Sequence, residues 1–252
     1  MNVYLYGVIK RPDEPRSLEL GCGVSDPAAP VRLLGYRDLA AAVSQVNEQE
    51  IGEAGGVRAL RRDVNSHTQV LNRLMDQTTV LPARFGILLP DEQTLVDKLL
   101  EPTYERLLED LERLRGTVEL TFRADYVEER ILEEVATEQP QLIGAGRRSI
   151  QNTYHARIET GRRIASAIRL KKEQDAQRLL ERLGRIAHDV AVADSRSELS
   201  VFRGSFLIRR EDLERFDREL ERVNAEAGSR MKLACVGPLP PFSFVHLQVG
   251  TG

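Results

Sequence analysis

The stretch Asn2-Val-Tyr-Leu-Tyr-Gly-Val-Ile9 decides the fold, because it offers apolar side chains to both sides of a strand. These side chains alternate between two faces: Val3, Leu5 and Ile9 against Tyr4, Tyr6 and Val8. A strand without a polar face is usually central in its sheet and covered on both sides. We therefore expect residues 2–9 to form the middle of a first sheet.

The segments that follow supply neighbouring strands and a covering helix. Short strands are expected at 31–36 and 39–46, although the alanines of the second also suit a helix. Residues 57–74 are predicted to be helical, because their apolar side chains recur at intervals of three and four. These side chains are Val57, Leu60, Val64, His67, Leu71 and Leu74.

Further along, single residues mark where helices begin and end. Asp91 is a good N-cap for a second helix. Pro102 cannot donate to a helical ladder, so we expect a kink or a fresh start there. Gly116 ends the leucine-rich helix before a strand at 117–125, whose apolar and polar residues alternate.

The second half contains the longest helical pattern, over residues 147–192. A continuous helix of that length would be about 70 Å long at 1.5 Å per residue, so we expect two antiparallel helices joined near 171–175. A short helix at 128–137 precedes this helical tract. The elements expected after it are a strand at 199–209, a helix at 211–227 and strands at 231–236 and 242–245.

Together these elements predict an α+β protein with two domains. The first, residues 1–115, is an N-terminal α+β domain, and the second, residues 116–249, contains the helical tract 147–192. The second-half order of strand, helix, strand, helix, strand, strand differs by one exchange from a ferredoxin-like order.

Composition narrows the function classes. The net charge of −3 argues against nucleic acid or an anionic membrane as the main partner. Only five of the 36 basic residues are lysine. Cys22 and Cys235 form no CxxC pair and the four histidines are scattered, so no metal site or cofactor is expected. With no signal peptide or membrane span recognisable, we expect a soluble, cytoplasmic protein with reduced thiols.

Four features of the sequence could carry chemistry or bind a partner. The glycine-rich run 144–149, with Arg147 and Arg148, could hold a phosphate, but it is GxGxxS and lacks a preceding buried strand, so a hinge is the better interpretation. His67 could be a base, but no nucleophile has a recognisable spacing to it, and a buried histidine bonded to the sheet is favoured.

The segment Leu81-Pro-Ala-Arg-Phe-Gly86 is the most individual in the chain. We favour a structural corner in which the Arg84 guanidinium bonds carbonyls or a carboxylate, over a site for an anion or a partner. The tail Gly237-Pro-Leu-Pro-Pro-Phe-Ser-Phe244 is open to two interpretations. Its prolines either lead into a plain strand or stiffen a contact surface that presents Phe242 and Phe244 to another chain.

These features, in this order, resemble the gas vesicle protein GvpL/GvpF family. The resemblance spans residues 3–245. It rests on the opening Tyr4-Leu-Tyr-Gly-Val8, His67 before Val80-Leu-Pro-Ala-Arg-Phe-Gly86, the strand Val118–Tyr126, Phe206-Leu-Ile-Arg-Arg210 and the tail Gly237–Val245. Its signature positions are His67, Leu81, Pro82, Arg84, Phe85, Gly86, Gly237, Pro238, Pro240, Pro241 and Phe242.

The resemblance implies a modified ferredoxin-like N-terminal domain and a ferredoxin-like C-terminal domain with a long helical insertion. It also implies a non-enzymatic accessory or minor structural protein at the gas vesicle, which binds the hydrophobic shell protein and possible further accessory proteins. The alternative is an enzyme of small anions or nucleotides that uses Gly144–Ser149, Arg84 and His67.

Overall fold

The computed structural model describes residues 2–12, 20–25, 29–47, 56–140, 154–194 and 197–247. The chain forms two compact units. The first comprises Met1–Glu119 together with Pro238–Gly252, and the second comprises Leu120–Gly237. The C-terminal segment therefore groups with the first unit, and the second unit is a single continuous insertion within it.

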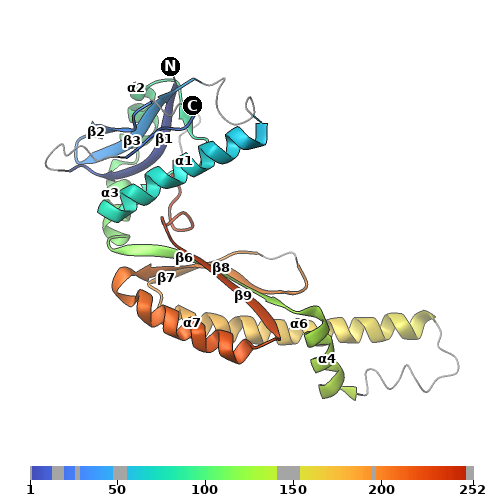
Figure 1. The fold of residues 1–252 in the computed structure, drawn as a ribbon. Coiled ribbons are helices and arrows are strands. Elements are labelled where there is room, and N and C mark those ends of the chain that lie inside the picture. The colour runs from blue at the N-terminus through green and yellow to red at the C-terminus, as the bar shows by residue number, and fades with distance from the viewer. Residues whose placement is uncertain are drawn as a thin grey trace. The chain divides into compact units, whose positions relative to one another are not determined.

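The first unit is built on an antiparallel sheet with β1 at its centre (Figure 1). The strand order is β2-β3-β1-β4, and β5 pairs with β1 as well. Residues 3–9 of β1 are buried, which confirms the central position predicted from its two apolar faces. The strands are β1 (Asn2–Lys10), β2 (Arg32–Tyr36), β3 (Leu39–Val46), β4 (Val80–Pro82) and β5 (Leu88–Leu89).

Helices α1 (Gly56–Gln77) and α3 (Tyr104–Arg113) both contact β1 and β4. The predicted N-cap is confirmed, because the Asp91 side chain accepts a 2.7 Å hydrogen bond from the Thr94 N–H at the start of α2 (Glu92–Leu95). A π-helical turn, Val96–Leu100, follows, and α3 starts afresh after Pro102. The proline thus separates two helices, as its missing N–H requires.

The helix predicted over residues 57–74 is confirmed, but only part of its apolar face is buried. Val57, Leu60 and Val64 are 68%, 41% and 38% exposed. Burial begins only at Asp63 and includes His67 and four apolar residues beyond it. The first turns of α1 extend past the end of the sheet (Figure 1). Periodicity identifies a helix face but not how much of it the sheet covers.

The second unit has a four-stranded sheet in the order β7-β8-β6-β9, with α6 and α7 together on one face (Figure 1). Its elements are β6 (Thr117–Tyr126), α4 (Glu128–Glu138), α6 (Tyr154–Gly184), β7 (Asp189–Val192), β8 (Ser200–Arg209), α7 (Leu213–Ala227) and β9 (Met231–Leu239). With α4 and α6 between its first two strands, this is the strand–helix–strand–strand–helix–strand order of a ferredoxin-like fold.

Three expectations for this half are wrong. The tract 147–192 does not fold as two antiparallel helices, because α6 is one helix that continues through 171–175. The tract also contains the strand β7, which the helical spacing of Ile186 and Val190 concealed. The expected last strand is absent from the described residues, because 242–244 form a turn and 245–247 have no regular structure. Exchanging that strand for β7 gives the ferredoxin-like order.

The core of the second unit is rich in phenylalanine. Phe122, Phe202, Phe206 and Phe216 contact one another with ring centroids 5.4–6.2 Å apart. On β6, the alternation predicted for 117–125 holds at Leu120, Phe122 and Ala124, which are buried, but Glu119 is buried as well. The Glu119 carboxylate is bonded to the tail, as described below.

Candidate partner-binding site

A hydrogen-bonded cluster joins β1, α1 and the corner formed by residues 81–86. The His67 Nε2 lies 3.1 Å from the Ala83 carbonyl oxygen, and its Nδ1 lies 3.0 Å from the Tyr4 hydroxyl. Since a carbonyl can only accept, Nε2 carries the proton and Nδ1 accepts from Tyr4. The Tyr4 oxygen in turn accepts a 3.0 Å bond from the Gly86 N–H.

Tyr6 extends this cluster toward β3. Its hydroxyl accepts a 2.8 Å bond from the Val24 N–H and lies 3.0 Å from the Ser44 hydroxyl. The His67 ring stacks on Tyr6 with centroids 5.6 Å apart, while the Phe85 ring meets His67 edge-on at 5.7 Å. Every polar side-chain atom of Tyr4, Tyr6 and His67 therefore has a hydrogen-bond partner, and all three side chains are buried.

Burial keeps this cluster uncharged. It lowers the pKa of His67 to about 4, against a smaller opposing effect of the bond to Ala83. Burial also raises the pKa values of Tyr4 and Tyr6 above the ordinary range. With both ring nitrogens engaged and no charge at neutral pH, His67 is arranged as a structural residue and not as an accessible base.

The corner itself is fixed by its backbone and its apolar residues. Leu81, Pro82 and Ala83 are buried, and Gly86 has φ = +92°, a conformation that L-residues with a side chain rarely adopt. Arg84 is exposed and has no hydrogen bond or ion pair to any residue that the structure describes. The predicted bonds from the Arg84 guanidinium to carbonyls or a carboxylate are therefore absent among the described residues.

The tail is held against the first unit by hydrogen bonds. The Ser243 N–H and hydroxyl donate to the Glu119 carboxylate at 2.8 and 2.7 Å, and Arg113 donates to the Phe244 carbonyl at 2.9 Å. Pro240 and Pro241 are buried, Pro238 is exposed, and Gly237 has a φ of 152°. The candidate contact residues Phe242 and Phe244 are only half-buried.

A groove of about 760 Å³ runs along α6 in the second unit. One wall is α6 itself, which presents Gly161, Ile164, Ala165 and Ile168 at intervals of three, one and three. The facing wall is α4, with Ile131 and Leu132, and residues 197–199 close one side. Leu132 is 40% exposed, so the groove offers apolar surface to solvent.

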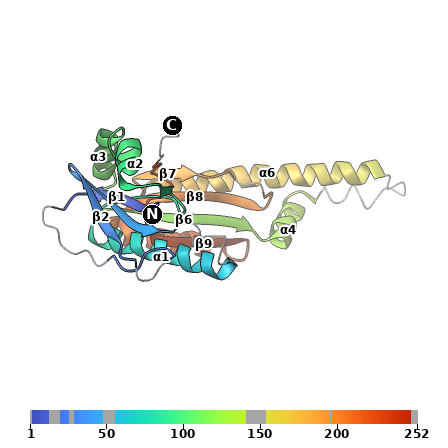
Figure 2. The same ribbon diagram turned by 90° about the horizontal axis from the view of Figure 1, so that it is seen from above.

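The N-terminal turns of α6 extend past the end of the sheet (Figures 1 and 2). A 31-residue helix is about 46 Å long at 1.5 Å per residue, which exceeds what the strands of this sheet can cover. Charged side chains border the groove: Arg162, Arg169 and Lys172 from α6, with Glu128 and Glu198 opposite. The result is an apolar floor with a mixed-charge rim.

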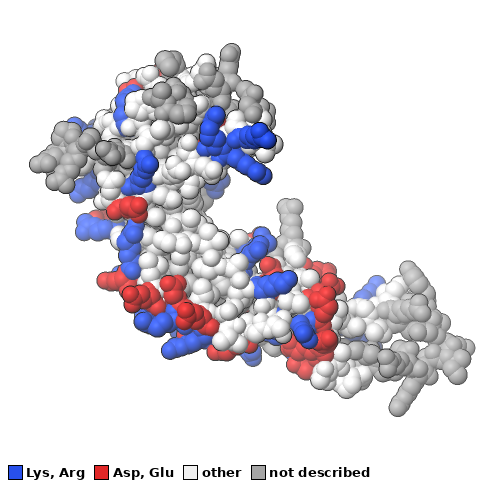
Figure 3. All heavy atoms as spheres, in the orientation of Figure 1, with Lys and Arg blue, Asp and Glu red and all other residues white. Residues whose placement is uncertain are grey.

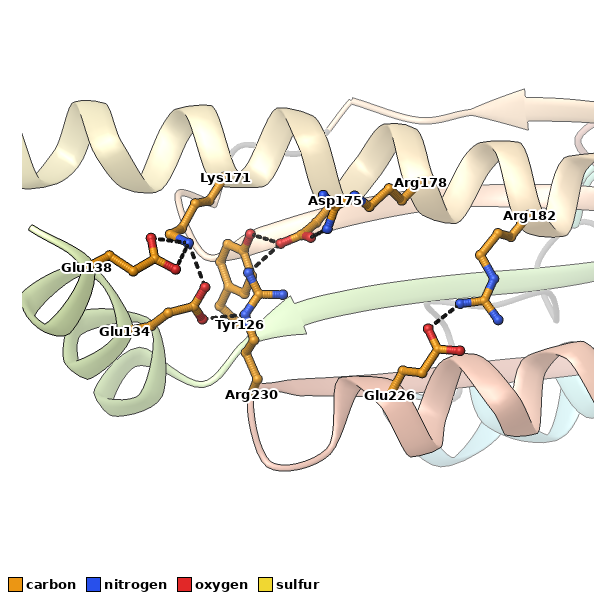
Figure 4. Close-up of polar contacts among 9 residues, drawn as sticks. All are labelled: Tyr126, Glu134, Glu138, Lys171, Asp175, Arg178, Arg182, Glu226 and Arg230. Carbon is orange, nitrogen blue, oxygen red and sulfur yellow. Dashed lines mark hydrogen bonds and ion pairs between the residues drawn. The ribbon is translucent and has the colours of Figure 1, made fainter.

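A network of ion pairs anchors α6 beside the groove (Figure 4). Arg230 bonds Glu134 on α4 at 2.5 Å and Asp175 on α6 at 2.6 Å. Lys171 bonds the same Glu134 at 2.6 Å, and the Tyr126 hydroxyl donates to Asp175 at 2.5 Å. Three elements, β6, α4 and α6, therefore meet the turn that carries Arg230 at one charged cluster, which stabilises the polar middle of α6.

The neighbouring charges of this network shift the pKa values of its members. Burial alone would raise the pKa of Glu134, but hydrogen bonds from Arg230 and Lys171 bring it below its ordinary value. Burial and the bond to Asp175 raise the pKa of Tyr126 far above its ordinary value. On the face shown in Figure 3, side chains of both signs lie on the second unit, whereas positive ones group near the N-terminal end of α1.

Sequence reasoning did not find the groove or the charged network. The polar interval Lys171–Asp175 suggested a joint between helices, whereas Lys171 and Asp175 lie four residues apart and both reach ion-pair partners. That spacing within an otherwise continuous stripe was the available signal. The candidate phosphate loop Gly144–Ser149 lies outside the described residues.

The described residues contain neither a metal-binding cluster nor a membrane-spanning helix. No group of three or more His, Cys, Asp or Glu side chains there is placed to hold a metal ion. No helix within the described ranges has both the length and the apolar character needed to cross a bilayer.

Similarity to known proteins extends over nearly the whole chain. A curated relative, gas vesicle protein F from Streptomyces sp., is 34% identical over 98% of this chain and 100% of its own length. The crystal structure of GvpF from Anabaena sp. superposes with a TM-score of 0.83 at 22% identity, covering 98% of this chain and 99% of that one. GvpF from Microcystis aeruginosa gives 0.78 at 21% identity, with the same coverage.

The fold described above is thus shared with the two GvpF crystal structures. Residues 2–246 match the family described as "Gas vesicle synthesis protein GvpL/GvpF". The chain belongs to the GvpL/GvpF family of gas vesicle proteins.

Proposed function

We propose that this chain is an accessory protein of gas vesicle assembly that binds the hydrophobic shell protein through the groove between α4 and α6. Family membership supports a role connected with gas vesicles. The single observation that carries the binding site is the open apolar groove, whose floor includes Leu132 and Ile164. Its location on the vesicle and contacts with other accessory proteins belong to the same proposal.

The physical need for such a protein follows from the nature of a hydrophobic subunit. A large exposed apolar patch promotes aggregation unless another surface covers it. An apolar groove between two helices is suited to receive an amphipathic helix, whose anchors recur at the same three- and four-residue intervals. The mixed charges on the rim would orient the bound segment without requiring one sign of charge.

The groove is a better candidate than the tail. Phe242 and Phe244 are half-buried, and the backbone between them is bonded to Glu119 and Arg113. Partner binding there would use only part of each ring, or would break those bonds. In the groove, Leu132 is 40% exposed, and Gly161 and Ala165 on α6 are exposed as well.

The alternative function as a small-anion enzyme has less support. It assigned a catalytic role to His67, but both nitrogens of that ring are bonded inside the protein and its pKa is lowered to about 4. The accessory role is therefore the function that the structure and the family membership favour together.

Co-purification with the shell protein tests the proposal. We expect the paired variant Leu132→Glu/Ile164→Glu to lose co-purification, because both changes put charge on the floor of the groove. Leu170→Glu is the matched control, because Leu170 is on the same helix and 57% exposed but does not line the groove. Equal binding by all three proteins would contradict the assignment, and circular dichroism checks that each variant folds.

A further inference from the structure

A second pocket, of about 360 Å³, lies between the C-terminal end of α6 and α7. Its charged lining consists of five arginines and one glutamate: Arg182, Arg185, Arg215, Arg218, Arg222 and Glu219. We call it the arginine pocket. All of these residues belong to the second unit, and none of them lines the groove of the proposed function.

This excess of positive charge is local and does not follow from the chain's preference for arginine. The adjoining pocket on the same two helices, of about 240 Å³, has three arginines and three carboxylates in its lining. Its carboxylates are Asp175, Glu181 and Glu226, and its arginines include Arg182, which both pockets share. The charges that line the adjoining pocket are therefore equal in number, whereas the lining of the arginine pocket has an excess of positive charge.

The single carboxylate of the arginine pocket is already shared. Glu219 accepts from Arg182 at 2.7 Å and from Arg222 at 3.3 Å. Among the residues that the structure describes, Arg215 and Arg218 have only distant ion pairs, at 3.9 Å to Asp212 and 3.8 Å to Glu214. Glu214 is 91% exposed, and such solvated pairs contribute little. Guanidinium capacity therefore remains for an external anion.

The arrangement on α7 is also unfavourable for the helix itself. Arg215, Arg218 and Arg222 follow one another at intervals of three and four, where like charges on a helix repel. Arg215 and Arg218 lie in the first turns of α7, where the helix dipole favours negative charge. A bound anion would relieve both effects, and in the pocket lining Glu219 alone offsets part of this positive charge.

We propose that the arginine pocket binds a multivalent oxyanion of the phosphate class. Guanidinium groups form paired, charge-assisted hydrogen bonds with phosphate oxygens, and several converging on one concavity favour an anion with more than one charge. The volume of about 360 Å³ is at the lower end of small-molecule sites, which suits a pyrophosphate-sized group. This site is independent of the groove, so either proposal can fail alone.

Pyrophosphate is the probe, titrated by calorimetry into the full chain at constant ionic strength. We expect saturable one-to-one binding that weakens about tenfold or more in Arg185→Gln/Arg218→Gln. The control is Arg130→Gln/Arg163→Gln, which removes two other exposed arginines with the same change in net charge. No binding by the native chain, or equal weakening in both double variants, would overturn the proposal.

Thermal unfolding supplies a second readout that a purely structural role would not give. Without ligand, Arg185→Gln/Arg218→Gln should melt at the same temperature as the native chain or higher, because like charges have been removed. Pyrophosphate should raise the melting temperature of the native chain but not of this variant. A fall in melting temperature without ligand would show that these arginines are structural.

Tighter binding of a hexaglutamate peptide than of pyrophosphate would contradict the phosphate class and identify an acidic protein segment as the ligand instead.

Discussion

The two units each contain a polar cluster, and the two clusters differ in their charge and in their exposure to solvent. The cluster of Tyr4, Tyr6 and His67 is neutral, fully hydrogen-bonded and shielded from water. The cluster of Glu134, Lys171, Asp175 and Arg230 is charged and sits at a partly exposed edge. This difference follows from the cost of burial. A neutral, hydrogen-bonded cluster can lie inside a core, whereas charged side chains need oppositely charged partners and some contact with solvent.

The largest effect is expected from removing the centre of the neutral cluster. His67→Ala removes the acceptor of the Tyr4 hydroxyl proton and the donor to the Ala83 carbonyl, and it creates a cavity. The change should cost about 3 kcal/mol of unfolding free energy. Urea denaturation measures it. His188→Ala is the control, since His188 is exposed and should change stability by less than about 0.5 kcal/mol. Similar losses in both variants would contradict the role assigned to His67.

Acid should affect the two clusters in different pH ranges. Because the folded-state pKa of His67 is lowered from 6.5 to about 4, its contribution is complete above pH 6.5 and is lost as pH falls toward 4. The loss should approach about 3 kcal/mol at most. The folded-state pKa of Glu134 is lowered below 4.5, so its contribution disappears only in more acidic solution.

Unfolding free energies measured from pH 7 to pH 4 check the predicted loss of the His67 contribution. The decline over that range should be smaller in His67→Gln, which has no titrating ring at this site. An unchanged decline in His67→Gln would assign it to other groups.

Breaking the charged cluster should have an intermediate effect. Asp175→Ala removes the acceptor for Tyr126 and Arg230 while leaving Arg230 partly buried, and we expect a loss of about 2 kcal/mol. Glu173→Ala is a suitable control, because Glu173 is exposed on the same helix. Equal unfolding free energies for the two variants would mean that the network does not anchor α6.

Salt should produce the smallest effect and separate the clusters most directly. At 1 M NaCl the Debye length is about 3 Å, so the exposed side of the charged cluster is screened. The cost of Asp175→Ala should fall by roughly 0.5 kcal/mol, as for partly exposed ion pairs. The cost of His67→Ala should not change, since no charge is involved. If salt changed the cost of His67→Ala more than that of Asp175→Ala, the assignment of the neutral and the charged cluster would be contradicted.

The contrast also explains how much of the fold could be predicted. The central strand β1, the Asp91 cap and the restart after Pro102 follow from local chemistry: two apolar faces, a side chain able to cap, and a missing N–H. By contrast, the continuity of α6 through Lys171 and Asp175 depends on Glu134 and Arg230, which are distant in the sequence. A polar interval has the same local pattern whether it is a loop or an anchored helix.

The candidate sites divide in the same way. The sequence determined that His67 and the corner Leu81–Gly86 are distinctive, because few residue types fit a buried helix face or a tight turn. Only the tertiary structure decided that His67 bonds that corner, that Arg84 points to solvent, and that β7 follows α6. The groove along α6 and the arginine pocket likewise exist only where separate elements meet. Local pattern fixes which face of an element is apolar, whereas the packing of distant elements decides what covers it.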